Sequence, residues 1–132
     1  MKFAYADPPY YGCGERIYGH LHPEAHIWDT REAHYELIQK LSDEFPDGWA
    51  LSMTSDDLKW QLPKCPDDVR VAVYNKTWHQ VRPTSTQFAW EPVVWRTTKK
   101  KRKRNPMVRD WISCNPTFMT GTPGAKPLPF NL

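Results

Sequence analysis

The chain has 132 residues, which suffices for a single domain with one modest core. Hydrophobic residues make up 39% of it, and no apolar stretch approaches the roughly 20 residues that cross a bilayer. The first seven residues lack the apolar segment of a signal peptide. Three scattered cysteines are too few for a disulfide framework and suit a reducing compartment. We therefore exclude the membrane and secreted classes and expect a cytoplasmic protein.

The charge is distributed unevenly along the chain. The formal net charge is +3, but one basic run alone carries six positive charges, which leaves −3 for the rest: Lys99, Lys100, Lys101, Arg102, Lys103 and Arg104. We expect a basic loop at about 97–106 that contacts the phosphates of a nucleic acid. A solvated loop without a binding role and a targeting signal are the alternatives.

Alternating strand and helix patterns run through the chain. In order, they predict a strand at 2–6, a loop at 11–31, a helix at 31–45, a strand at 49–53, a short helix at 55–62, and strands at 69–74, 88–96 and 110–113. Leu37, Ile38 and Leu41 have helical spacing, and Thr30 suits the start of that helix. The alternation favours an α/β fold with a largely parallel sheet in a single domain.

The chemistry-bearing motif is Asp7-Pro8-Pro9-Tyr10, directly after the first predicted strand, at the edge where α/β sheets bind ligands. With this motif, the chain resembles the MT-A70-like adenine-N6 DNA methyltransferases, in the small form of phage and bacterial genomes. Further similar segments occur in the right order: Asp47-Gly48-Trp49-Ala50-Leu51-Ser52, Ala89-Trp90-Glu91-Pro92-Val93, Val108-Arg109-Asp110-Trp111 and Gly124-Ala125-Lys126-Pro127. The resemblance implies a Rossmann-like methyltransferase sheet in permuted order, with the catalytic motif first.

It also implies S-adenosyl-L-methionine as cofactor and DNA as the partner, in the cytoplasm of a bacterium or a phage-infected host. The exocyclic amine of a base is a poor nucleophile because its lone pair is delocalised into the ring. The Asp7 carboxylate and the Pro8 carbonyl would accept hydrogen bonds from the two N–H groups of this amine and free its lone pair. Pro8 and Pro9 fix the backbone in advance. Tyr10 would offer a flat face to the extruded base.

The resemblance assigns Asp7 and Lys126 to the cofactor side, with Lys126 pairing the methionyl carboxylate. Relatives in this permuted order carry a glycine-rich Phe-x-Gly-x-Gly segment after the Lys-Pro pair, and nothing after Pro127 matches it. We therefore expect a partial methyltransferase domain over 1–132, incomplete at its C-terminus. A partner chain or a missing C-terminal segment would then complete the cofactor site.

Several other residues are candidates for substrate binding. They are Tyr11 and Tyr18 in a loop expected to close over the target base, Asn75, Lys76 and Trp78 after the third strand, Glu91, and the basic run. The resemblance implies that Glu91 lies near the base, and a structural salt bridge is an equal alternative. An ordinary loop is the alternative for Asn75, Lys76 and Trp78. We expect the remaining tryptophans, Trp60 among them, to serve packing.

We do not expect a metal site. Cys13, His20, His22 and His26 lie close together in the sequence, but their spacing matches no standard ligand pattern. Two alternatives to an adenine-N6 methyltransferase remain open. One is a catalytically inactive nucleic-acid-binding remnant, and the other is a cytosine-N4 methyltransferase, because both amines need the same chemistry.

Overall fold

The computed structural model describes residues 2–76, 83, 85–86, 88–98 and 109–114. The elements are β1 (Phe3–Ala6), η1 (Gly14–Tyr18), η2 (Ala25–Asp29), α1 (Arg31–Glu44), β2 (Gly48–Ser52), η3 (Ser55–Asp57), α2 (Leu58–Gln61), η4 (Leu62–Lys64), β3 (Arg70–Lys76), β4 (Trp90–Thr97) and β5 (Trp111–Cys114). The predicted strands and the long helix are confirmed, with boundaries shifted by one or two residues. None of the described helices has the length and apolar character needed to cross a membrane.

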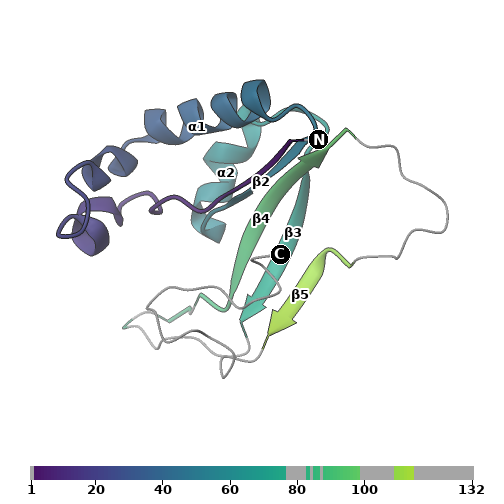
Figure 1. Ribbon diagram of the computed structural model, residues 1–132. Helices are drawn as coiled ribbons and strands as arrows, with labels where there is room; N and C mark the ends of the chain where they lie inside the picture. Colours follow the sequence, from purple (N-terminus) through teal and green to yellow (C-terminus); the bar gives the residue numbers. More distant parts are fainter. Residues whose placement is uncertain (1, 77–82, 84, 87, 99–108, 115–132) are drawn as a thin grey trace.

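The strands form one open, mixed sheet of five strands in the order β1-β2-β4-β3-β5 (Figure 1). β1 is parallel to β2 and β3 is parallel to β5, whereas β4 is antiparallel to both of its neighbours. Four strands therefore point one way, in agreement with the predicted largely parallel sheet, and β4 is the exception that makes the sheet mixed. The helix α1 provides the crossover that the parallel pair β1–β2 requires, whereas an antiparallel pair such as β3–β4 needs none.

The helix α1 forms where a capping residue precedes an apolar stripe. The Thr30 hydroxyl accepts a hydrogen bond from the Ala33 N–H at 3.4 Å, which satisfies one free donor of the first turn. Ile38 and Leu41 are buried, one helical turn apart, and pack against the sheet. Burial of each such side chain contributes about 1.5–3 kcal/mol. This packing fixes α1 on the sheet.

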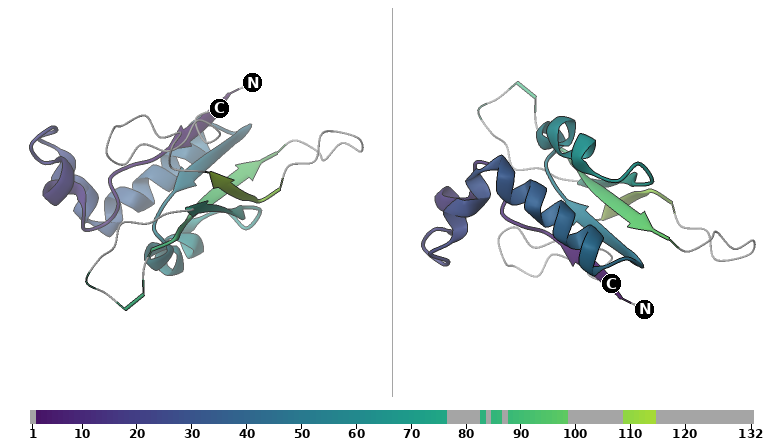
Figure 2. Two further views of the ribbon diagram at one scale, coloured as in Figure 1. Left: turned by 90° about the horizontal axis from the view of Figure 1, so that it is seen from below. Right: turned by 90° about the horizontal axis from the view of Figure 1, so that it is seen from above.

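The core lies on one face of the sheet. Trp49, Leu51 and Met53 follow one another at alternate positions from β2 onward, so all three point to the same face, where α1 packs. Leu58 and Leu62 pack against the same cluster. Both α1 and the short helical segment that contains α2 therefore cover this face (Figure 2). By the strand register, Tyr5, Ser52, Tyr74 and Glu91 belong to the opposite face.

The predicted loop at 11–31 contains two short helical turns, η1 and η2, which pack against each other. The Asp29 carboxylate accepts hydrogen bonds from the Gly14 N–H at 2.8 Å and from the Glu15 N–H at 3.1 Å. Gly14 lies so close to η2 that an added Cβ would meet the Ala25 carbonyl oxygen at 2.1 Å. The segment is therefore a compact hairpin closed at its base by Asp29, rather than the continuous loop that the sequence predicts.

Candidate functional site

The motif Asp7-Pro8-Pro9-Tyr10 leaves β1 at the carboxyl edge of the sheet, as predicted. The side chain of Asp7 is exposed, whereas Pro8, Pro9 and Tyr10 are partly buried. The Tyr10 carbonyl accepts a hydrogen bond from the Cys13 N–H at 2.8 Å, and Gly12 between them has a φ of 81°. This is a tight turn whose third residue needs a positive φ, a conformation that glycine adopts freely.

The carboxylate of Glu91 connects β4, β3 and the motif at this edge. One of its oxygens accepts a hydrogen bond from the Tyr10 hydroxyl at 2.9 Å, and the other lies 2.8 Å from the Lys76 ammonium. Glu91 is the second residue of β4 and Lys76 is the last residue of β3, diagonal to it across the antiparallel pair. Their side chains are only 15% and 28% exposed, so solvent screens this ion pair less than a surface pair.

The environment of Tyr10 keeps its hydroxyl protonated. Burial raises the pKa of the Tyr10 phenol well above its usual range, and the negative charges of Glu91 and Asp7 raise it further. The phenol therefore remains a hydrogen-bond donor to Glu91 over the accessible pH range. This bond fixes the orientation of the Tyr10 ring beside the exposed Asp7.

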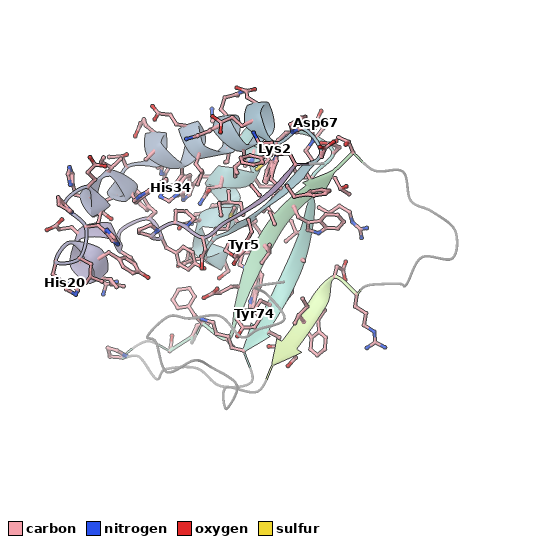
Figure 3. The ribbon with its side chains drawn as sticks, in the orientation of Figure 1. Lys2, Tyr5, His20, His34, Asp67 and Tyr74 are labelled. Carbon is pink, nitrogen blue, oxygen red and sulfur yellow. The ribbon has the colours of Figure 1, made fainter. Side chains whose placement is uncertain are left out.

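A pair of hydroxyl groups lies on the same face of the sheet as Glu91. The Tyr5 hydroxyl and the Ser52 hydroxyl are 2.8 Å apart, and this contact joins β1 and β2 near their carboxyl ends. Figure 3 shows Tyr5 and Tyr74 toward the carboxyl ends of their strands, whereas Lys2 and Asp67 lie toward the opposite edge. The Tyr5–Ser52 pair therefore lies on the same face of the sheet as Glu91.

An aromatic cluster lies on the helical side of the same edge, where the sequence predicts only packing tryptophans. Tyr11 and Trp60 have ring centroids 5.4 Å apart, and His34 is 5.6 Å from Trp60. His34 is buried, and its Nε2–H donates to the Trp28 carbonyl at 2.9 Å. Burial lowers the pKa of His34, so the ring is held neutral.

The structure brings only some of the predicted site residues together. Asp7, Tyr10, Lys76 and Glu91 come together at the carboxyl edge. Asn75 and Lys76 belong to β3 itself rather than to a following loop, and Asn75 alternates to the face opposite that of Lys76. Tyr18 lies in η1, and among the described residues its side chain forms no hydrogen bond with Asp7, Tyr10, Lys76 or Glu91.

The remaining predicted residues lie outside the described part of the chain. They are Trp78, the basic run Lys99 to Arg104 and the cofactor-side Lys126. Within the described residues, no three histidine, cysteine or acidic side chains converge on a point that could hold a metal ion.

No protein-family model matches the chain, and no curated protein matches it. The motif and the geometry of this edge are therefore the features that bear on function.

Proposed function

We propose that the chain is an S-adenosyl-L-methionine-dependent methyltransferase acting on the exocyclic amine of a base in nucleic acid, with N6 of adenine in DNA as the preferred target. The observation that carries the proposal is the arrangement of the motif. Asp7 is exposed at the carboxyl end of β1, beside a Tyr10 ring that Glu91 holds in place. Ligands of α/β sheets bind at this edge.

Each motif residue has a role in this chemistry. The Asp7 carboxylate accepts one N–H of the target amine and the Pro8 carbonyl accepts the other, which draws the amine lone pair out of conjugation. The prolines fix φ on either side of the Pro8 carbonyl, so that acceptor is oriented before the base arrives. The Tyr10 ring stacks on the base after it leaves the helix.

The chemistry of the edge also fits the cofactor. S-Adenosyl-L-methionine supplies an electrophilic methyl group on a positively charged sulfonium. The exposed Asp7 carboxylate and the electron-rich face of Tyr10 are groups that favour a neighbouring cation. Asp7 would lie on the cofactor side, as the resemblance to MT-A70-like enzymes implies, and Lys126 would bind the methionyl carboxylate.

The arrangement of the sheet is compatible with this proposal. An open α/β sheet whose first strand ends in the motif is what a Rossmann-like methyltransferase in permuted order requires. The two carboxylates near the edge differ in exposure, since the Glu91 side chain is only 15% exposed and contacts Tyr10 and Lys76, and Asp7 is exposed to an incoming ligand. Asp7 is therefore the residue whose replacement separates catalysis from binding.

Incubation of the protein with S-adenosyl-L-methionine and DNA, followed by mass spectrometry of the digested nucleosides, tests the proposal. We expect N6-methyladenine with the natural chain and none with Asp7→Ala. The matched control is Asp56→Ala, which removes another exposed carboxylate and should leave methyl transfer intact. N4-methylcytosine would identify the cytosine enzyme instead. DNA binding without any modified base would identify a non-catalytic binding protein.

A further inference from the structure

We propose that a cation–aromatic surface beside the motif, formed by Tyr11, Arg31, Tyr35, Trp60 and Lys64, binds the nucleic-acid strand next to the target base. In this assignment Arg31 and Lys64 contact phosphates, and a neighbouring base stacks on Tyr11. The inference rests on the proposed function for its target base. The binding itself requires no methyl transfer and is tested separately.

Arg31, the first residue of α1, is held against two rings. Its guanidinium lies 5.1 Å from the Trp60 ring centroid and 5.9 Å from that of Tyr11. The ammonium of Lys64 lies 5.1 Å from the Tyr35 ring centroid. Cation–π contacts of this kind orient the charged groups but leave their N–H donors available, because a ring face accepts charge without occupying each donor.

Among the described residues, neither cation forms an ion pair with a carboxylate. The ion pairs of the described residues involve Arg70, Lys76 and Arg96, and no described carboxylate lies within 4.0 Å of the charged nitrogens of Arg31 or Lys64. Within the described part of the chain, no carboxylate therefore compensates these two positive charges at short range. An anionic ligand would complement them, and a phosphate fits the planar fork of an arginine.

The rings of the surface are built on a buried support. The Trp60 Nε1–H donates to the buried Asp57 carboxylate at 3.1 Å, and the buried His34 ring meets Trp60 edge-on. Tyr35 also packs edge-on against Trp60, with centroids 5.7 Å apart. Because these contacts fix the rings before a ligand binds, stacking on them loses little conformational freedom.

The chemistry of the surface favours a nucleic acid over other anions. Tyr11 is 39% exposed, so an aromatic face lies open beside the oriented guanidinium. Exposed aromatic rings combined with uncompensated cations are the two elements with which proteins bind single strands. An acidic peptide would use the cations but would have no ring to stack on Tyr11.

The position of the surface matches a strand that enters the site. Tyr10 and Tyr11 are adjacent in the tight turn at Gly12, yet Tyr10 contacts Glu91 of β4, whereas Tyr11 contacts Trp60 in the helical layer. The Arg31 guanidinium lies 5.9 Å from the Tyr11 ring centroid, and Tyr11 directly follows the motif, so Arg31 is near the motif. A nucleotide next to the extruded base would reach this surface.

The salt dependence of DNA binding tests the phosphate contacts. Fluorescence anisotropy with a labelled duplex, at a series of salt concentrations, should show a smaller slope for Arg31→Gln and for Lys64→Gln, by about 0.9 for each lost contact. At 0.1 M salt, the same relation gives about an 8-fold weaker affinity. Lys40→Gln is the matched control, since it removes an exposed charge nine residues further along α1 and should leave the slope unchanged.

Two further variants separate the ring from the charge. Tyr11→Ala should weaken binding of a labelled single strand about 5-fold without changing the salt slope, because it removes a stacking face but no charge. Arg31→Lys should retain most of the slope, because it keeps the charge. Far-UV circular dichroism checks that each variant is folded.

Arg31→Gln and Lys64→Gln that keep the natural slope, as Lys40→Gln does, would overturn the proposal even if the protein methylates DNA. Conversely, if the variants show the expected slopes but the protein transfers no methyl group, the proposed nucleic-acid-binding surface would be supported and the proposed methyltransferase activity would be refuted. A polyglutamate peptide that competes as strongly as the oligonucleotide would show an acidic protein partner and would also overturn the proposal.

Discussion

The hydrogen bond from Tyr10 to Glu91 is the contact on which the geometry of the site depends most directly. Tyr10→Phe removes one hydroxyl and keeps the ring, so Glu91 loses this hydrogen bond and keeps its ion pair with Lys76. A hydrogen bond to a charged group contributes about 1.5–3 kcal/mol, and partial exposure places this one in the lower half of that range. We expect Tyr10→Phe to lower the free energy of unfolding by about 1.5–2 kcal/mol.

Urea denaturation followed by tryptophan fluorescence measures this change. For a domain of this size, the same loss lowers the midpoint of thermal unfolding by about 5–7 °C. A double-mutant cycle with Glu91→Ala isolates the pair, because removal of Glu91 already abolishes the bond that Tyr10→Phe deletes. The double variant should be less destabilised than the sum of the single variants, by about 1 kcal/mol or more.

Strict additivity of the two substitutions would refute the reasoning, since it would mean that the hydroxyl and the carboxylate do not interact. Lys76→Met is a useful companion, because it leaves the Tyr10 bond in place and removes only the ion pair. Its cycle with Tyr10→Phe should show weaker coupling than the cycle with Glu91→Ala. This order distinguishes a direct bond from general loosening of the edge.

Three further predictions concern single groups. Burial lowers the pKa of His34 from its ordinary 6.5, so the unfolded chain binds the proton better than the folded chain. The free energy of unfolding should therefore fall as the pH drops below 6.5. In urea denaturation, His34→Gln, which keeps an N–H donor, should lack that fall. Gly12→Ala should lower the free energy of unfolding by about 1–2 kcal/mol in the same assay, through its φ of 81° alone, since an added Cβ meets nothing within 4 Å; an unchanged midpoint would contradict this. Burial raises the pKa of Cys65 to about 11, so iodoacetamide at pH 8 should alkylate Cys65, identified by mass spectrometry, far more slowly in the folded chain than in urea; equal rates would refute it.

The local elements and the position of the motif could be predicted from sequence, because their causes are local. The Thr30 cap and the spacing of Ile38 and Leu41 predicted α1, and the prolines after Ala6 marked the end of β1. The site was predicted only in part. The residues of the Glu91 network were named as candidates, but the bond between Tyr10 and Glu91 spans 81 positions and follows from where β4 enters the sheet.

The aromatic cluster was missed for the same reason. Tyr11, His34 and Trp60 come from three separate elements, and no periodicity relates their positions. The insertion of β4 between β2 and β3 was equally hidden, because a strand pattern predicts a strand but not its neighbours or its direction. Long-range pairing, rather than local propensity, determines both features.

The closure of the hairpin by Asp29 has a consequence for its tip. The carboxylate binds the N–H groups of Gly14 and Glu15, so the two ends of the hairpin are joined independently of the residues between them. Leu21, near the tip, is 62% exposed. Lengthening the chain there would raise only the entropic cost of closing this loop, by about 0.6 kcal/mol for a doubling of its length, because the loop is already joined at its base. The tip is therefore a position at which evolution can add or remove sequence while the sheet and its carboxyl edge keep their geometry.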